Sequence, residues 1–207
     1  MGLVRREAKP MTEGPQSPRG VEQILAALAD PSPDRRRAAA RSLVSYPCAV
    51  ERLAARLPEE PDLSVREAIL TVLMRRASTE VVSHLIPYLS SEDPWLRNAV
   101  MEALPQMPEA CHGALERQLD DPDPDVRLFA VTILGKLGDP LAHARLLGVL
   151  TREPHVNVCA AAVEAMSEHG TLAAIPALRG LPGRFPDEPF ITFASELSIA
   201  RITARLS

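Results

Sequence analysis

Metal binding is the first chemistry to consider, because the chain has five histidines and three cysteines. His155 and Cys159 are four residues apart, a spacing that places both side chains on one face of a helix. A zinc site needs three or four protein ligands, and this pair lacks the third and the fourth. We therefore expect no metal and no other cofactor, and we interpret Cys159 as a small buried residue.

Catalytic motifs give no support for an enzyme. The chain lacks the GxSxG turn of serine hydrolases, and it lacks the GxGxxG and GxxxxGK[ST] loops that cradle nucleotide phosphates. Its acidic residues fall mainly at expected turns and helix starts, where capping of free N–H groups explains them. We expect no catalytic residue, and we expect that the protein is not an enzyme.

The composition favours closely packed helices. Hydrophobic residues make up 46% of the 207 residues but aromatic residues only 3%, so Ala, Leu, Val and Ile must build the core. The formal net charge of −4 argues against a general nucleic-acid binder. Three widely spaced cysteines without a CxxC motif indicate a reducing compartment, and we expect a cytoplasmic location.

The N-terminal segment differs from the rest of the chain. Residues 1–20 include three prolines after the first few residues and contain no apolar run typical of a secretory signal. We predict a disordered tail over residues 1–20 and a folded domain over residues 21–207. No apolar run anywhere in the chain has the length of a membrane-spanning helix, so we expect no membrane association.

The elements that would position any functional residue come from a repeat. The stretch DPDPDVRLFAVTILGKLGDP, Asp121 to Pro140, joins a Pro- and Asp-rich turn to an apolar pattern of helical period. Similar stretches flank it. When they are aligned on Arg127, the equivalent positions are Arg36, Arg66, Arg97, Cys159 and Ile191, and we call this the anchor position. From Arg36 to Cys159 the anchors are 30, 31, 30 and 32 residues apart, which indicates a repeat protein.

A second apolar segment of helical character precedes each copy, so each repeat is two helices joined by a turn. Gly138 and Gly170 follow helix ends, where we expect left-handed caps. We predict an all-α fold, a right-handed α-solenoid of about six antiparallel helix pairs. The alternative is an ordinary globular bundle whose helices happen to look alike.

The aligned copies resemble the HEAT-repeat family, and in particular the short HEAT-like repeats of the phycobilisome-lyase type. The resemblance covers nearly all of residues 21–207. It implies that each anchor arginine bonds to an acid six residues earlier, in its own or a neighbouring repeat. The implied pairs are Asp30 with Arg36, Glu60 with Arg66, and Asp121 with Arg127. Ser91 and Cys159 depart from this pattern, so we expect the series of pairs to be interrupted there.

By the same resemblance, the second helices line the concave side and form the partner-binding surface. Residues one, five and nine positions after an anchor lie opposite the apolar face. With Trp95, these positions give the candidate partner-binding residues, which are Arg37, Arg41, Glu67, Arg75, Trp95, Asn98, Glu102, Lys136, Glu164 and Glu168. This surface is basic near its N-terminal end and acidic near its C-terminal end, which would orient a partner of opposite charge. The alternative is that these are ordinary solvated helix faces and that Trp95 packs over a turn.

The last repeat is atypical, because three of the four phenylalanines in the chain lie close together there, Phe185, Phe190 and Phe193. Large apolar residues at the end of a repeat array fit a cap that seals the core, and we predict a C-terminal capping repeat. The alternative is that the same cluster is exposed and forms a docking patch or a dimer contact.

The function predicted from the sequence is a non-enzymatic adaptor that binds a protein or peptide along the second helices. The resemblance permits one alternative, a lyase or chaperone that attaches bilin pigments to proteins. A second alternative is a HEAT-like DNA-binding protein, which only the basic run from Arg35 to Arg41 supports. We therefore expect a protein partner and no nucleic acid.

Overall fold

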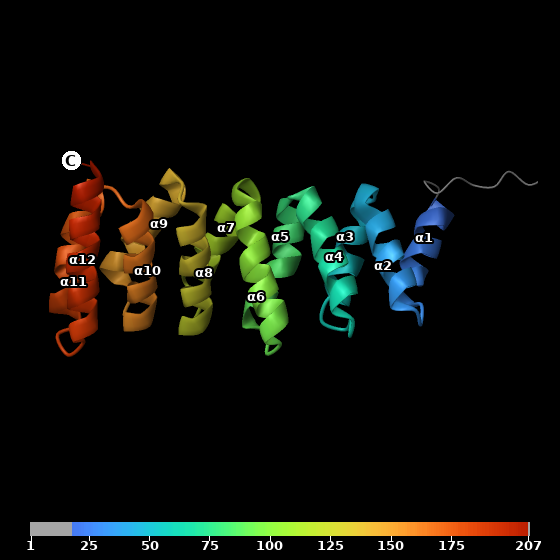
Figure 1. Ribbon diagram of the computed structural model, residues 1–207, viewed down its shortest axis with the longest axis horizontal. Coiled ribbons are helices and arrows are strands. Elements are labelled where there is room, and N and C mark those ends of the chain that lie inside the picture. The colour runs from blue at the N-terminus through green and yellow to red at the C-terminus, as the bar shows by residue number, and fades with distance from the viewer. Residues whose placement is uncertain (1–17, 207) are drawn as a thin grey trace, which may run out of the picture. The chain divides into compact units, whose positions relative to one another are not determined.

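The computed structural model describes residues 18–206, and within that range every regular element is a helix (Figure 1). The predicted tail falls mostly on residues 1–17, outside the described residues, and α1 already begins at Pro18. The first helix of each pair is, in chain order, α1 (Pro18–Ala26), α3 (Val50–Arg56), α5 (Thr79–Leu85), α7 (Pro108–Gln118), α9 (Pro140–Arg152) or α11 (Ile175–Arg184). The second helix of each pair is α2 (Pro33–Ser42), α4 (Leu63–Arg76), α6 (Pro94–Ala103), α8 (Pro124–Leu137), α10 (Val156–His169) or α12 (Pro189–Leu206). The predicted all-α fold of six helix pairs is confirmed.

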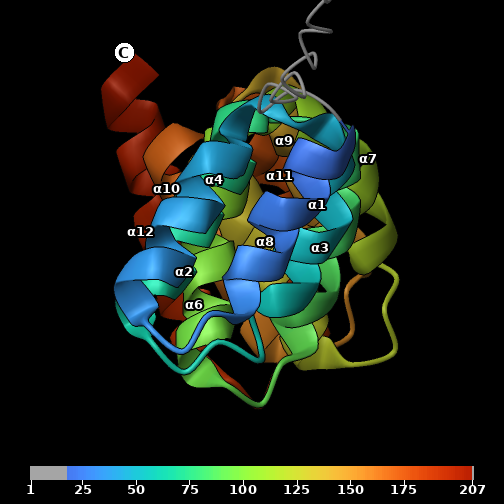
Figure 2. The same cartoon turned by 90° about the vertical axis from the view of Figure 1, so that its right-hand side faces the viewer.

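The chain forms two compact units, with unit 1 ending at Arg75 and unit 2 beginning at Arg76. In unit 1 the first helices α1 and α3 lie on one side and the second helices α2 and α4 on the other (Figure 2). In unit 2 each second helix packs on the next, so that α10 contacts both α8 and α12. This stacking leaves one long face of the second helix of each pair at the surface. The sequence predicts that this face binds a partner.

Local sequence determines where the helices begin. The carboxylates of Asp93, Asp123 and Asp139 accept hydrogen bonds from backbone N–H groups in the first turns of α6, α8 and α9, and each of these helices has proline in its first turn. Pro87, which cannot donate a backbone hydrogen bond, lies where α5 gives way to a short 3₁₀ segment, Ile86–Ser90.

The two predicted glycine caps differ in outcome. Gly138 ends α8 with a φ of 62°, so the left-handed cap is confirmed there. Gly170 has a φ of −63°, so the same prediction is wrong for α10. A methyl group at Gly170 would lie 2.4 Å from the carbonyl oxygen of Met166, and this close approach gives the position its own need for glycine.

The anchor arginines bind backbone carbonyls, whereas the resemblance implied bonds to acidic side chains. Each donates to the carbonyl oxygen of the residue six positions earlier: Arg36 to Asp30 at 2.9 Å, Arg66 to Glu60 at 2.5 Å, Arg97 to Ser91 at 2.6 Å and Arg127 to Asp121 at 2.8 Å. Because every residue has a carbonyl, Ser91 does not interrupt the series.

The carboxylate partners of two anchor arginines come from the following repeat. Arg36 donates through Nε and Nη2 to the two carboxylate oxygens of Glu60, at 2.9 and 2.7 Å. Arg127 makes the same two-pronged contact with Glu153, at 2.9 and 2.8 Å. These pairs join consecutive repeats within each unit, so the arginines connect repeats as well as stabilising their own turn.

At Cys159 the anchor position lacks a guanidinium group, and an arginine on another helix supplies one. The Cys159 thiol donates to the carbonyl oxygen of Glu153 at 3.3 Å, again six residues earlier. Arg184, on α11, donates to the same carbonyl and to that of Leu150. The guanidinium that is missing from the anchor position is therefore supplied by the next helix pair.

Candidate partner-binding surfaces

Unit 1 has a hollow of about 530 Å³ between its two second helices, which we call the basic hollow. Its lining residues are Arg37, Arg41, Ser64, Glu67, Ala68, Thr71, Val72 and Arg75. Four of these were predicted from the repeat to bind a partner. The structure thus brings together Arg37 and Arg41 from α2 with Glu67 and Arg75 from α4.

The arginines of the basic hollow differ in how they are held. Arg37 donates to Asp34 at 2.5 Å and to the hydroxyl of Ser64 at 3.1 Å, which fixes its guanidinium at one side of the hollow. Arg41 and Arg75 are exposed and make no side-chain hydrogen bond or ion pair with the part of the chain that the structure describes. Because Asp34 matches Arg37, the two guanidinium groups of Arg41 and Arg75 against the single carboxylate of Glu67 give the hollow a positive potential and leave donors free for an anionic group.

Unit 2 has a smaller hollow of about 210 Å³ between α8 and α10, which we call the acidic hollow. Its lining residues are Thr132, Gly135, Lys136, Ala161, Glu164, Ala165 and Glu168. The ammonium group of Lys136 donates to the carboxylate of Glu102 at 2.5 Å, so its charge is already matched. Glu164 and Glu168 therefore determine the sign of the hollow.

Gly135 explains why this hollow is narrow. A methyl group at Gly135 would lie 2.8 Å from the Cβ atom of Ala165, so the two helices approach more closely here than side chains would permit.

Trp95 and Asn98 line neither hollow. Trp95 is half-buried in the first turn of α6, where its backbone N–H donates to Asp93 at 2.9 Å, whereas Asn98 is exposed. The structure therefore leaves Trp95 between the two sequence interpretations, a packed aromatic and an exposed anchor.

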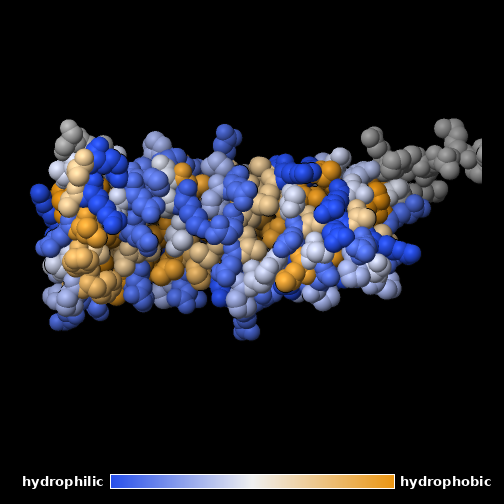
Figure 3. Space-filling view, in the orientation of Figure 1, coloured by the Kyte–Doolittle hydropathy of each residue, from blue (hydrophilic) through white to orange (hydrophobic). Residues whose placement is uncertain are grey.

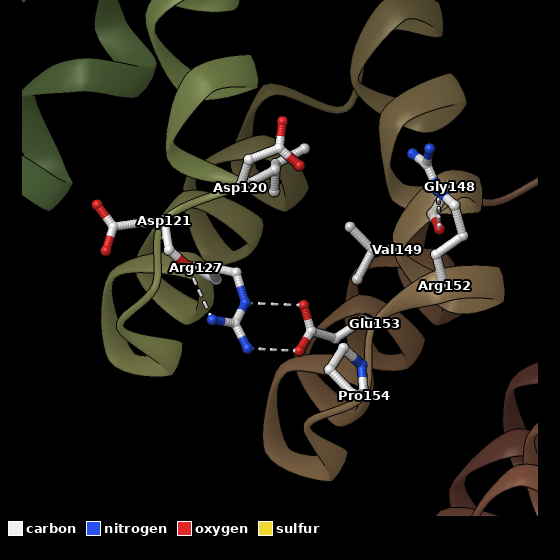
Figure 4. A pocket seen from close by; sticks show the side chains of 9 residues that line it. Asp120, Asp121, Arg127, Gly148, Val149, Arg152, Glu153 and Pro154 are labelled. Atoms are coloured by element: carbon white, nitrogen blue, oxygen red, sulfur yellow. Dashed lines mark hydrogen bonds and ion pairs between the residues drawn. The ribbon is translucent and has the colours of Figure 1, made fainter.

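A third hollow, of about 350 Å³, lies beside the ion pair that joins Arg127 to Glu153. Figure 4 shows these two side chains facing each other, with the carboxylate of Asp121 pointing away from them. Burial raises the pKa of the Glu153 carboxyl, but hydrogen bonds from Arg127 and from the backbone N–H of His155 outweigh burial and hold the pKa below its ordinary value. A carboxylate held ionised in this way connects repeats and is a poor general acid or base at neutral pH.

One histidine, His112, is held by two structural partners. His112 contacts Asp139 through Nε2 at 2.9 Å and Arg145 through Nδ1 at 3.1 Å. Because arginine can only donate, Nδ1 accepts from Arg145 and Nε2 donates to Asp139, so these contacts hold the ring between α7 and α9. Within residues 18–206, no group of three or more His, Cys, Asp or Glu side chains is arranged to hold a metal ion. In the same range, no helix is both long and apolar enough to cross a membrane.

These features define a class of protein, the helical-repeat proteins built from consecutive helix pairs. Within this class, the family model of HEAT repeats matches residues 113–188. The resemblance to HEAT repeats that the sequence indicated is therefore confirmed over this part of the chain.

Individual relatives are distant. The curated "Uncharacterized phycocyanin operon protein Z" of Pseudanabaena tenuis (strain PCC 7409) is 24% identical over 163 residues, which cover 74% of this chain and 79% of that protein. The solved complex of CpcE and CpcF of phycocyanin lyase from Nostoc sp. PCC7120 is 19% identical, with a TM-score of 0.36 over 96% of this chain and 100% of the matched one. The archaeal HEAT-like repeats protein from Thermococcus onnurineus NA1 is 12% identical, with a TM-score of 0.46 over 91% of this chain and 89% of that one.

Sequence reasoning found all of the charged residues that line the two hollows, because the repeat frame identifies the outward positions of each second helix. It missed Ser64, which lies two positions before an anchor and holds Arg37. It also misjudged part of the C-terminal cluster. Phe190 and Phe193 are 44% and 68% exposed, so the expectation that they seal the core is wrong for these two side chains.

Proposed function

We propose that the protein is a non-enzymatic scaffold that binds a protein partner through the exposed faces of its second helices. The observation that supports this most directly is the basic hollow, where the side chains of Arg41 and Arg75 have no partner within the described residues. Arginine forks of this kind match carboxylate groups geometrically and electrostatically. We infer that an acidic segment of the partner occupies the basic hollow.

Affinity would come from several contacts of moderate strength. Exposed charge pairs contribute little individually, but a carboxylate that enters a hollow is partly desolvated and its hydrogen bonds to guanidinium become stronger. Complementary charge also accelerates association and discriminates between partners. The expected partner is therefore recognised by its pattern of acidic residues and is released as ionic strength rises.

The test is to isolate a partner with the full chain and then to measure its affinity with purified components. We expect the double variant Arg41→Glu and Arg75→Glu to weaken binding at least tenfold at moderate salt, because both free donors become repulsive. The matched control is Arg52→Glu with Arg117→Glu, which makes the same change in net charge at exposed positions on the first helices α3 and α7. If the control weakens binding as much as the double variant does, or if the double variant binds normally, the basic hollow is not the binding surface.

A second candidate function is that of a pigment lyase or chaperone, which the similarity to a phycocyanin operon protein favours. Three arginines in the basic hollow could hold the carboxylates of a linear tetrapyrrole, although no aromatic side chain lines this hollow to stack on the pigment. Titration of the purified chain with a bilin distinguishes the two functions. A shifted absorbance band that is lost in the variant Arg41→Glu with Arg75→Glu would favour pigment binding over the scaffold.

A further inference from the structure

The last helix, α12, buries Ile191 and Ile202 as expected, but it also buries two serines and exposes three large apolar side chains. Ser195 and Ser198 point inward and are each 1% exposed, whereas Phe190, Phe193 and Leu197 are 44%, 68% and 39% exposed. The Ser195 hydroxyl is buried without a hydrogen-bond partner. A helix of a water-soluble protein normally buries its large apolar side chains and exposes its serines.

The neighbouring second helices do not share this exposure of large apolar side chains. Leu197 is six positions after its anchor, and the equivalent residues Ile133 in α8 and Ala165 in α10 are buried. Phe193 is two positions after its anchor, where α10 has the small residue Ala161 and α8 has Phe129, which is half-buried against Arg97. The exposed apolar surface is therefore particular to α12, and it is not a general feature of the second helices.

The three exposed side chains form one continuous stripe. Phe190, Phe193 and Leu197 are spaced i, i+3 and i+7, so they lie on one side of α12 and extend for about 10 Å along it. Figure 3 shows hydrophobic surface gathered over the part of the molecule where Figure 1 places α12. We call these three residues the α12 stripe. An exposed apolar stripe of this kind marks an interaction site.

Acidic residues flank the α12 stripe on the same face of unit 2. Glu196 lies on α12 and Glu164 is its equivalent on α10, five positions after the anchor in both helices. Both are exposed, and neither side chain has a partner within residues 18–206. Arg201, which is also exposed, donates to the hydroxyl of Ser167. Glu164 and Glu196 are therefore unmatched carboxylates beside the stripe, whereas Arg201 and Arg205 place positive charge on the two turns of α12 that follow it.

We propose that the α12 stripe and its acidic flank bind an amphipathic helix of a partner protein, whose apolar stripe is bordered by lysine or arginine. The i, i+3, i+7 spacing of the stripe matches the spacing of apolar residues on such a helix, and Glu164 and Glu196 match its basic border. A second copy of this chain matches the two carboxylates less well, because its own stripe is flanked by Glu164 and Glu196 and not by a row of basic side chains. An anionic membrane surface would likewise be repelled by these two carboxylates.

This proposal rests on the exposed apolar side chains of α12 and does not depend on the basic hollow. It adds a second contact surface to the proposed scaffold. This surface prefers a basic partner segment, whereas the basic hollow prefers an acidic one. The two can fail separately, because Arg41 and Arg75 belong to unit 1 whereas the α12 stripe belongs to unit 2.

The experiment uses the full chain and a fluorescent 18-residue peptide with leucine at helical i, i+3, i+4, i+7 spacing and lysine elsewhere. Two companion peptides replace every lysine by glutamate or scramble the order of the same residues. We expect the Leu/Lys peptide to bind by fluorescence anisotropy at least tenfold more tightly than either companion. Phe193→Ser should weaken binding of the Leu/Lys peptide about tenfold. The double variant Glu164→Lys with Glu196→Lys should weaken binding of this peptide even more and should reduce the dependence of binding on salt.

The matched control for the stripe is Leu172→Ser, which removes an apolar side chain that is 55% exposed but lies in a 3₁₀ turn before α11. It should bind the Leu/Lys peptide as the wild type does. Circular dichroism establishes that each variant is folded, which is expected because the changed side chains are exposed. Equal binding of the Leu/Glu peptide, or binding that Phe193→Ser leaves intact, overturns the proposal. Sedimentation that shows a wild-type dimer dissociated by Phe193→Ser also overturns it, because the stripe would then bind a second copy.

Discussion

Neutralising Glu60 is the most direct test of how the repeats of unit 1 are held together. The Glu60 carboxylate is fully buried and accepts hydrogen bonds from Arg36 at 2.7 and 2.9 Å, from Arg56 at 3.1 Å and from the backbone N–H of Asp62 at 2.9 Å. Glu60→Gln keeps the shape of the side chain but leaves the buried guanidinium of Arg36 without its counter-charge. Removing one partner of a buried ion pair costs about 3–5 kcal/mol, and we expect the lower end because the amide oxygen still accepts one bond.

Urea denaturation followed by circular dichroism measures this loss. A loss of about 3 kcal/mol lowers the midpoint by about 1.5 M if the slope is about 2 kcal/mol/M. The adjacent residue provides the control, since the Glu59 side chain is 72% exposed and lies 3.6 Å from Arg56. Glu59→Gln should leave the midpoint unchanged. Equal midpoints for the two variants would refute the conclusion that the pair between Arg36 and Glu60 holds successive repeats together.

The same carboxylate makes stability depend on pH. Burial raises the pKa of Glu60, but hydrogen bonds from Arg36, from the Asp62 backbone and from Arg56 outweigh burial and hold the pKa below its ordinary value. The stabilisation is therefore complete above the unfolded-state pKa of about 4.3 and is lost as the pH falls through the lower folded-state pKa. We expect the gap in urea midpoint between wild type and Glu60→Gln to be constant near pH 7 and to close as the pH falls below about 4. A gap that widens on acidification would contradict this sign.

Two further predictions concern glycines and cysteines. Gly138→Ala should lower the free energy of unfolding by about 1 kcal/mol, because the residue has a φ of 62°. Gly113→Ala should raise the free energy of unfolding by about 0.5 kcal/mol, because a methyl group in this helix meets no atom within 4 Å. Thermal denaturation of both variants tests the pair, and an equal effect at the two sites would contradict the cap geometry. Burial raises the pKa of the Cys111 and Cys159 thiols to about 11, so iodoacetamide at pH 8 should modify the exposed Cys48 in the native protein and the other two only after unfolding. Mass spectrometry of the folded protein after reaction with iodoacetamide should show one adduct. Fast labelling of Cys159 would contradict this prediction, because it would show that this thiol is open to solvent.

Several features of the site could be read from the sequence because they depend on neighbours along the chain. The repeat frame placed Arg37, Arg41 and Arg75 on the outward face of second helices, and the structure gathers them in one hollow. A helix has a fixed angular period, so the side that a residue occupies follows from its distance to the anchor. The hollow itself was not predictable, because its depth depends on the small side chains of Ala68 and Val72 between the helices.

The sequence could not identify the partners of the anchor arginines. Arg36 and Glu60 are 24 residues apart, and the register between one repeat and the next determines that they meet. From the resemblance we expected each anchor arginine to bond to the acidic side chain six residues earlier. In the structure the arginine donates to the backbone carbonyl of that residue instead. The register between repeats also determines the contact of Arg184, which donates to the carbonyl of Glu153 from the following helix pair. Spacing along the chain alone could not assign this contact.

By itself, the sequence determined the all-α class, the pairing of the helices and the outward faces, since each follows from a period of 3.6 or about 30 residues repeated along the chain. It also placed Phe190 and Phe193 in one C-terminal cluster of phenylalanines. Only the tertiary structure decided that these two side chains are exposed together with Leu197 and that Ser195 faces inward. The physical reason is that helical periodicity determines which side chains share a face, whereas the packing of α12 on α10 and α11 determines which face is covered.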